Sequence, residues 1–343
     1  MFAKIEKRKI ILMITVLIDV IGIGVVIPVL PFFVEQIGGG PQWVTRLFAV
    51  FSVCSFFSMP FLGALSDRIG RRPVLLISIL STAIGWLVFA SAKSILFLFV
   101  GRIIDGLAAG NFSTAQSYLV DISKDDKERT SNLGIIGALF GAGFMIGPAL
   151  GGLLGEFSPT LPFWFVGCLA SVNFILAFFF LPETNFNRSQ KKMSFNPFAP
   201  LLRGLKSRRL LPTYFAWLFF AIAASTQQSI SSLYMNEVFG FTAGIIGMLF
   251  TAQGLLMVIN QGFVIKKFWL TRFNEANLAL FSVLGLSFGF AFMASPFLGL
   301  FLLGVVVSIF TQPLFRVTVV SESVGLAAAN EKMIIPNELK NAR

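Results

Sequence analysis

The stretch GALSDRIGRRPVLL, residues 63–76, decides how the rest of this chain is interpreted. It places one acid and three arginines, between Asp67 and Arg72, in a short segment that separates two long apolar runs. Gly63 would let two helices approach closely, and Gly70 would permit a turn with positive φ. Asp67 can form charge-assisted hydrogen bonds with the arginines. A loop that only carried positive charge would explain the arginines but not the acid and the glycines, so we expect a structured junction between two helices.

The composition indicates a protein that crosses a membrane several times. Of the 343 residues, 56% are hydrophobic and 13% are charged, about half the charged share of soluble domains. Such a chain cannot cover its apolar core with polar surface, so we expect a polytopic membrane protein. The sequence has no histidine, which excludes a histidine-based triad, metal site or proton relay and leaves Asp and Glu as candidate proton carriers. Its two cysteines predict neither a disulfide framework nor a metal motif, so we expect no metal, no cofactor and no enzyme activity.

Ten apolar runs are long enough, at roughly 20 residues, to be membrane helices. They span residues 9–31, 44–65, 74–92, 95–118, 132–154, 162–182, 210–235, 242–264, 276–295 and 297–319. Of the 27 Lys and Arg residues, all but Arg46, Lys93 and Arg102 lie in alternate loops or at the termini. The positive-inside rule therefore predicts that both termini are cytoplasmic. The net charge of +11 then reflects topology, and we expect a lipid bilayer and no nucleic acid as partner.

Polar stretches divide the chain into four predicted parts. We expect an N-terminal six-helix bundle, a basic cytoplasmic linker, a partial C-terminal bundle of four helices and a polar cytoplasmic tail. Their bounds are 1–182, 183–209, 210–320 and 321–343. A monomer is expected, with self-association if the second bundle is incomplete.

Three further segments, each inside one of the apolar runs, have a distinctive pattern of glycine, proline and charged residues. They are DVIGIGVVIPVLP (19–31) in the first run, GRIIDGLAAG (101–110) in the fourth and GALFGAGFMIGPALGG (137–152) in the fifth. Together with the loop at 63–76 they resemble, in order, motifs of the major facilitator superfamily, in particular of its drug/proton antiporters of the tetracycline-efflux type. The resemblance covers residues 10–182 well and is weak from 183 to 320. It implies an all-α fold of two six-helix bundles around a cavity that opens alternately to each side, with the last two of the usual twelve helices missing here.

Asp19 lies midway along the first apolar run. A carboxylate in hydrocarbon costs at least ~2.5 kcal/mol, so it should face a cavity or a partner, which makes it a candidate proton carrier. The alternative is a helix-packing acid with a local partner. Arg102 and Asp105 lie three residues apart on the fourth run and can pair on one helix face. Such a pair could only lower the insertion cost, whereas the resemblance implies a role for Arg102 near the protonation site, and both interpretations stay open.

The resemblance also implies that Asp121 pairs with Arg71 and forms a gate cluster with Asp67, although a solvated loop acid is the alternative. The predicted gate residues are Gly63, Asp67, Arg68, Gly70, Arg71, Arg72 and Asp121. In the fifth run, small residues predict close helix packing and a kink at the proline. The residues of this packing motif are Gly143, Gly147, Pro148, Gly151 and Gly152.

Polar residues inside the runs are candidates to line a substrate cavity. They are Asn111, Gln116, Gln227, Gln228 and Asn260. Each can equally form a helix–helix hydrogen bond. The pair Gln227–Gln228, within AASTQQSISS, is the strongest candidate.

Two departures from the family pattern bear on the substrate. Tetracycline-type exporters have an acid in the ninth helix and one in the third, whereas this chain has no acid inside a second-half run and has Gly85 and Trp86 at the third-run position. The resemblance therefore does not carry tetracycline or its Mg²⁺ chelate over as substrate. It implies proton-coupled export of small lipophilic compounds across a bacterial cytoplasmic membrane. The alternatives are a metabolite or sugar transporter on the same fold, or a truncated, transport-inactive remnant.

Overall fold

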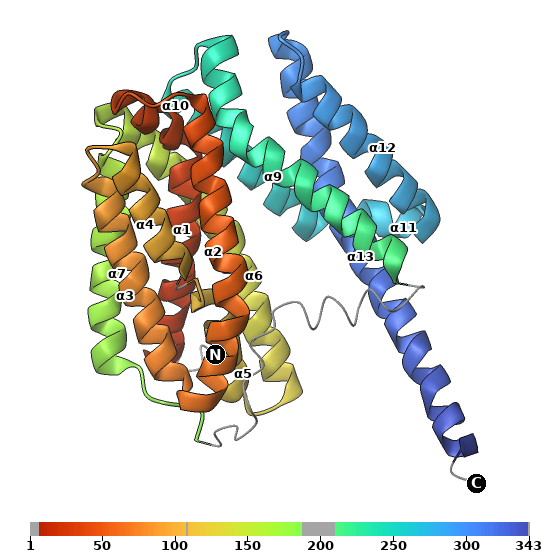
Figure 1. Cartoon of the computed structure of the whole chain (residues 1–343). Coiled ribbons are helices and arrows are strands. Elements are labelled where there is room, and N and C mark those ends of the chain that lie inside the picture. The colour runs from red at the N-terminus through yellow and green to blue at the C-terminus, as the bar shows by residue number, and fades with distance from the viewer. Residues whose placement is uncertain (1–6, 108, 187–209, 342–343) are drawn as a thin grey trace. The chain divides into compact units, whose positions relative to one another are not determined.

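The computed structural model describes residues 7–107, 109–186 and 210–341, so most of the predicted linker lies outside the described residues. The helices are α1 (Lys7–Gln36), α2 (Pro41–Ile69), α3 (Arg71–Ala90), α4 (Ile95–Leu107), α5 (Asn111–Asp121), α6 (Asp126–Phe157), α7 (Leu161–Phe180), α9 (Leu211–Phe239), α10 (Ala243–Ile259), the π-helical segment η1 (Asn260–Trp269), α11 (Leu270–Arg272), α12 (Glu275–Met293) and α13 (Leu298–Asn341). The described part of the chain contains no strand (Figure 1). The predicted all-α class is confirmed.

Eight helices among the described residues are long and apolar enough to cross a membrane, with α4 and α5 together forming one of them and α10 and η1 another. Two of the ten expected spans fall short. The apolar part of α12, Asn277–Met293, is shorter than the others. α9 has enough residues, but the serines and glutamines in its middle lower its hydropathy. The expected polar tail continues the last span, because α13 runs as one helix to Asn341.

The chain forms two compact units that do not follow its order. One comprises Met1–Pro197 with Ser229–Gly254, and the other comprises Phe198–Gln228 with Leu255–Arg343. α9 and α10 each begin in one unit and end in the other. The predicted domain bounds at 182 and 210 stay a prediction.

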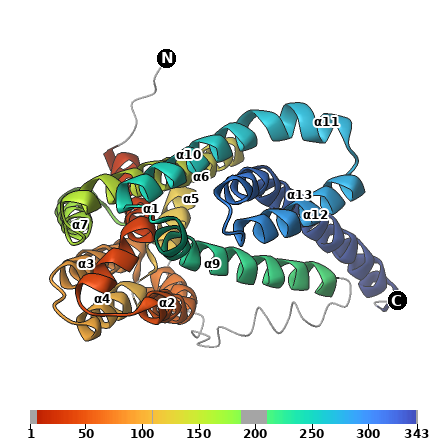
Figure 2. The same ribbon diagram turned by 90° about the horizontal axis from the view of Figure 1, so that it is seen from above.

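In the first unit α1 is the most buried span. Viewed along the bundle, it lies among α2, α5, α6 and α7 (Figure 2). Its residue Phe33 belongs to an aromatic core with Trp86, Phe89 and Phe163, which joins α1 to α3 and α7. Large apolar side chains such as Phe97 and Phe179 are exposed instead. In a spanning bundle this surface faces lipid.

A line of glycines sets the distance between α1 and α6. A Cβ on Gly143 would lie 2.7 Å from Val20, one on Gly147 would lie 2.8 Å from the Cα of Gly24, and one on Gly151 would lie 2.6 Å from the Val25 carbonyl. These distances are too short for any side chain, so the two backbones touch. The predicted close packing of the motif is present at these three glycines.

The rest of the packing motif faces α10. A Cβ on Gly152 would lie 2.7 Å from the Ala243 carbonyl, and one on Gly247 would collide with the Pro148 carbonyl. At the same end, Glu156 Oε1 accepts hydrogen bonds from Thr242 Oγ1 at 2.6 Å and from the Gly244 N–H at 3.1 Å. Glu156 thus caps the start of α10 and fastens it to the end of α6.

In the second unit, one buried amide ties η1 to α13. Asn260 Nδ2 donates to the carbonyls of Ile309 at 3.0 Å and Phe310 at 3.2 Å. Pro313 has no N–H, so the carbonyl four residues earlier, that of Ile309, lacks its helical donor. Asn260 supplies the missing donor.

Candidate functional site

The fourth span is interrupted in its middle, where α4 ends at Leu107 and α5 begins at Asn111. An interruption frees backbone carbonyls that must find donors inside the protein. Two hydroxyls from neighbouring helices do this: Ser81 donates to the Ile104 carbonyl at 2.7 Å and Ser58 to the Gly106 carbonyl at 2.7 Å. Broken helices of this kind commonly line the working site of membrane transporters.

Asn111, the first residue of α5, gathers polar groups from three helices. Its Nδ2 donates to Asp19 Oδ1 of α1 at 3.1 Å and to Thr82 Oγ1 of α3 at 3.2 Å. Asn111 is 4% exposed, and its Oδ1 has no hydrogen-bond partner among the described residues. The structure therefore brings together Asp19 and Asn111, which the sequence had suggested separately.

Arg102 and Asp105 lie on the last turns of α4, beside this group. The predicted pair is present, with Arg102 Nη1 3.8 Å from Asp105 Oδ2 and side chains that are 6% and 13% exposed. Asp105 is also close enough to Asp19 for electrostatic interaction. We call Asp19, Thr82, Arg102, Asp105 and Asn111 the buried polar site. It holds two carboxylates and one guanidinium in the interior of the first unit.

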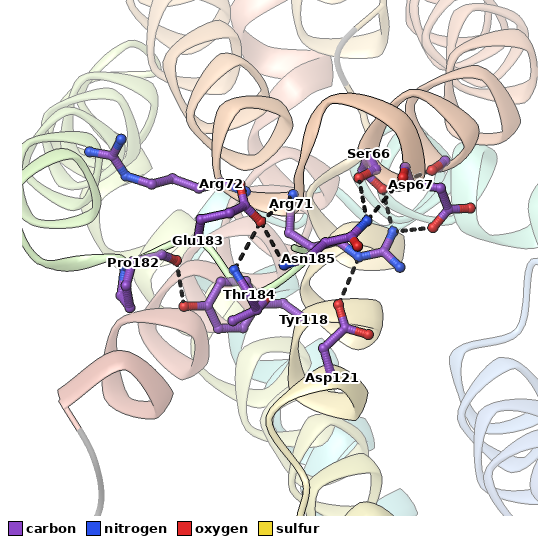
Figure 3. A network of polar contacts seen from close by, with 11 residues as sticks. Ser66, Asp67, Arg71, Arg72, Tyr118, Asp121, Pro182, Glu183, Thr184 and Asn185 are labelled. Atoms are coloured by element: carbon purple, nitrogen blue, oxygen red, sulfur yellow. Dashed lines mark hydrogen bonds and ion pairs between the residues drawn. The ribbon is translucent and has the colours of Figure 1, made fainter. Parts of the chain in front are cut away.

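A second polar cluster lies where α2 meets α3 (Figure 3). Arg71 stands between two acids: its Nη1 is 2.6 Å from Asp67 Oδ1, and its Nε donates to Asp121 Oδ2 at 3.0 Å. Arg71 Nη1 also donates to Ser66 Oγ at 2.6 Å. The expected pairing of Asp121 with Arg71 is therefore present, and Arg71 joins Asp121 and Asp67 in one cluster that links α2, α3 and α5. We call these three charged residues the Arg71 cluster.

Gly70 has the predicted positive φ, at 115°. A Cβ there would also collide with the carboxylate of Glu183. A second property expected of this loop is not found: nothing among the described residues lies within 4 Å of a Cβ built on Gly63, so the expected close helix approach at this glycine is wrong. Arg68 is exposed, and Arg72 Nη2 donates to the Phe178 carbonyl at 2.7 Å.

Glu183 is a cap that sequence reasoning missed. Its Oε1 accepts from the N–H groups of Arg71 at 2.8 Å, Thr184 at 2.9 Å and Asn185 at 2.9 Å, and its Oε2 accepts from that of Arg72 at 3.1 Å. Partial burial opposes ionisation, but these four backbone donors outweigh it and lower the pKa of Glu183. The carboxylate therefore caps the start of α3 from a segment more than a hundred residues away.

The segment around Glu183 also closes the end of α2 (Figure 3). Asn185 Nδ2 donates to the Asp67 carbonyl at 3.0 Å, and Tyr118 donates from its hydroxyl to the Pro182 carbonyl at 2.8 Å. Residues 182–185, PETN, thus fasten the end of α7 to α2, α3 and α5. The sequence signal for this cap was a proline, an acid and an asparagine directly after an apolar run. Nothing in the neighbouring sequence indicated that Glu183 would cap α3.

The candidate cavity residues have different environments. Asn260 is fully buried and its amide serves the backbone of α13, so its interpretation as a cavity residue is wrong and the helix–helix alternative holds. Gln116 on α5, and Gln227 and Gln228 on α9, are half-buried. Their role in a cavity stays a prediction.

Comparison with known proteins assigns the chain to a family. The family model described as Major Facilitator Superfamily matches residues 12–329. This chain belongs to the Major Facilitator Superfamily. It is therefore a multi-pass membrane protein of a transporter family, and the predicted fold class is confirmed.

Curated relatives in the superfamily include drug resistance proteins. The tetracycline resistance protein, class C, of Escherichia coli is 32% identical over 268 residues, which are 76% of this chain and 67% of the relative. The class B protein of Escherichia coli is 29% identical over 84% of this chain and 73% of its own length. The quinolone resistance protein NorA of Staphylococcus aureus is 24% identical over 81% of this chain and 71% of its own length.

Solved superfamily structures share the fold at lower identity. The human organic anion transporter MFSD10 has a TM-score of 0.68 at 23% identity and covers 93% of this chain and 85% of its own. The nucleoside transporter NupG has a TM-score of 0.71 at 14% identity and covers 91% of this chain and 80% of its own. These likenesses support the arrangement of helices that brings the buried polar site together.

Proposed function

We propose that this superfamily member exports small lipophilic compounds in exchange for protons, by alternating access across the cytoplasmic membrane with both termini inside. The observation that carries the proposal is the buried polar site. The site holds two neighbouring carboxylates and one guanidinium, which leaves one surplus negative charge when both acids are ionised. An uncompensated charge in hydrocarbon is costly, and a proton is the smallest particle that removes it.

The chemistry of the site is a reversible proton transfer. A proton from water adds to a carboxylate oxygen of Asp19 or Asp105, and the same O–H bond breaks when the proton leaves on the other side. Asn111 Nδ2 donates to the ionised form of Asp19, so protonation weakens that hydrogen bond. Because Asn111 begins α5, the charge of Asp19 is linked to the position of this half-helix. This link supports a coupling between proton binding and helix movement.

The Arg71 cluster supports the second half of the proposal, which is gating. It joins α2, α3 and α5 by two ion pairs at the end of the bundle that the positive-inside rule assigns to the cytoplasm. Breaking it frees α2 and α3 to move apart, whereas the cap by Glu183 keeps the junction itself folded. The cluster would therefore stabilise one state of the transport cycle without touching substrate.

Names of the relatives suggest which compounds to try. Two curated relatives are called tetracycline resistance proteins and one a quinolone resistance protein. We infer lipophilic drugs of comparable size as the substrate class. Tetracycline itself is the weaker choice, because the second-half spans carry no acid to bind its metal chelate.

The test uses liposomes that hold the purified full chain, an imposed pH gradient, and a panel of lipophilic fluorescent dyes with a quinolone and tetracycline. Transport in the parent chain should depend on the gradient, and Asp19→Asn should lower it by at least about a hundredfold, as expected when a positioned proton carrier is removed. Asp105→Asn, measured alongside, shows which carboxylate carries the proton.

The matched control is Thr15→Val. Thr15 lies on α1 one turn before Asp19, is buried, and hydrogen-bonds with Asn173 rather than with the buried polar site. It should leave the gradient dependence intact. Export that is equally fast without a gradient, or in both Asp19→Asn and Asp105→Asn, would exclude proton coupling through this site.

A further inference from the structure

Arg102 is a buried cation with few hydrogen bonds. It is 5% exposed, and its Nε and Nη2 have no hydrogen-bond partner among the described residues. The distance of 3.8 Å to Asp105 is too long for a hydrogen bond. A guanidinium carries five N–H donors, and burying them unpaired is strongly unfavourable unless another interaction compensates. Something other than hydrogen bonding must therefore hold Arg102 in the interior.

Three aromatic rings surround the guanidinium. Its Cζ lies 4.8 Å from the ring centroid of Phe89, 4.9 Å from that of Trp86 and 5.6 Å from that of Phe51. All three distances are within the range of cation–π attraction, which is strongest where water is excluded and strongest for tryptophan. Two of the rings come from α3 and one from α2. The charge is thus held by ring faces.

Trp86 is held in its orientation by two further helices, α1 and α7. A Cβ on Gly22 of α1 would lie 3.0 Å from Trp86 Cζ2, so that glycine makes room for the indole. The ring of Phe163 on α7 stacks on it at 6.1 Å with an interplanar angle of 7°. Gly22 follows Asp19 by three residues on α1. The indole therefore connects the helix of Asp19 to the guanidinium of Arg102.

We propose that Trp86, with Phe89, is the positioning residue of this site: its ring face holds Arg102 in the membrane interior while the N–H edges of the guanidinium stay free to approach Asp105 when that acid is ionised and to move away when it is protonated. The inference rests on the proposed proton coupling and deepens it. Hydrogen-bond acceptors would tie the guanidinium to one geometry, whereas a ring face is indifferent to rotation of the cation above it. The charge can thus remain buried while either carboxylate takes up or releases a proton.

The ionisable surroundings of Arg102 are few. Asp105 lies on its own helix, and Asp19 of α1 lies close to Asp105. α2 contributes the ring of Phe51 and the Cys54 thiol, which packs against Gly106, and α3 contributes the rings and the Thr82 hydroxyl. A pH profile of transport therefore reports on Asp105, which faces Arg102, and on Asp19, which lies close to Asp105.

The test compares Trp86→Leu, Trp86→Phe and Phe163→Leu in the liposome assay across pH. Without the indole, the cation loses its support in the interior and Asp105 loses its positive neighbour. The pH of half-maximal transport should then move upward by about one unit in Trp86→Leu, which corresponds to an interaction of cation–π strength. Trp86→Phe retains a ring face and should show less than half of that shift.

Phe163→Leu is the matched control. It removes a fully buried ring from the same aromatic core, but this ring does not face Arg102. It should lower thermal stability without moving the pH profile. Equal profiles in Trp86→Leu and the parent chain, or equal shifts in Trp86→Leu and Phe163→Leu, would overturn the proposal, since Trp86 would then only fill space.

A second measurement separates this inference from the proposed function. Dicyclohexylcarbodiimide reacts with protonated carboxyl groups in membranes, and peptide mass spectrometry locates the product without any need for transport. The pH at which half of the Asp19 or Asp105 carboxyl reacts should move upward in Trp86→Leu and stay in place in Phe163→Leu. If the parent chain does not transport but this shift occurs, the proposed function fails and the positioning role stands; if no shift occurs, the positioning role fails.

Discussion

Asn111 and Asn260 are both buried asparagines, and each is the first residue of a new helical segment inside a membrane span. Their side-chain amides nevertheless donate to different kinds of acceptor. Asn111 donates to two side chains, one of which is the carboxylate of Asp19. Asn260 donates to two backbone carbonyls of α13, one of which Pro313 has deprived of its helical donor. Burial and residue type are the same, and only the partner differs.

The difference teaches how to separate structural from functional polar groups in a membrane interior. A backbone carbonyl cannot change its charge, so the hydrogen bond of Asn260 is permanent and contributes to stability. A carboxylate can take up a proton, so the hydrogen bond from Asn111 to Asp19 is stronger when the acid is ionised and weaker when it is protonated. The strength of this bond therefore changes with the protonation state of the site. Four predictions test this comparison.

The largest effect on folding is expected at Asn260. Asn260→Leu keeps the size but leaves two buried carbonyls without the amide, and should lower the free energy of unfolding by about 2 kcal/mol. Adding Pro313→Ala returns an N–H to the Ile309 carbonyl and should recover much of the loss. Unfolding of the detergent-solubilised chain, followed by tryptophan fluorescence, measures the double-mutant cycle. Additive losses in the double variant would show that Asn260 does not compensate for Pro313.

The close contact between α1 and α6 at Gly143, Gly147 and Gly151, here called the seam, lies on the helix that carries Asp19. In Gly147→Ala the new Cβ would meet backbone atoms of Gly24 and Ile21 at 2.8 and 2.9 Å. Backbone atoms cannot rotate away from the new Cβ as the end of a flexible side chain could. We therefore expect a loss of about 1–3 kcal/mol in the free energy of unfolding, together with slower transport. Gly137→Ala is the control on the same helix, since nothing among the described residues lies within 4 Å of its Cβ, and it should be neutral. Equal thermal stability of the two variants would refute the role of the seam.

Asn111→Leu should affect transport more than stability, whereas Asn260→Leu should affect stability more than transport. A hydrogen bond to a carboxylate that contributes about 1.4 kcal/mol corresponds to a tenfold change in rate, so transport should fall about tenfold. Its pH profile should also change, because Asp19 loses a donor to its ionised form. Asn260→Leu, reconstituted at the same folded amount, should keep the parent pH profile. The comparison fails if the two variants alter pH dependence alike.

The smallest effect is expected at Glu183, where a charged side chain serves the backbone. The pKa of Glu183 is lowered in the folded chain, so its contribution to stability is present above the ordinary glutamate pKa of about 4.3 and disappears as pH falls through the lower folded value. Glu183→Gln keeps one acceptor but turns an NH₂ group toward the Arg72 N–H. It should therefore be less stable than the parent chain at pH 7, and this difference should disappear as the pH falls through the lowered pKa of Glu183. A difference that persists unchanged at acidic pH would contradict the assigned cap.

Asp19, Gly70, Arg71 and Asp121 could be singled out from the sequence because their signals are local or belong to a motif. An acid in an apolar run, or a glycine between two arginines, is visible within ten residues. The two expectations that failed, close packing at Gly63 and a cavity role for Asn260, concern neighbours that the motif does not name. Residue type indicated what these positions could do, but the contacts decided what they do.

By itself, the sequence determined the all-helical membrane class, the positions of most spans and the membership of the superfamily, because hydropathy and motif spacing are properties of contiguous residues. Only the tertiary structure decided that Glu183 caps α3, that Asn111 joins Asp19 to Thr82, and that aromatic rings hold Arg102. Each of these interactions joins different segments of the chain, which for Glu183 and α3 are more than a hundred residues apart. A polar side chain in the bilayer core cannot hydrogen-bond with water, so its role depends on which partner the packing of the helices places beside it.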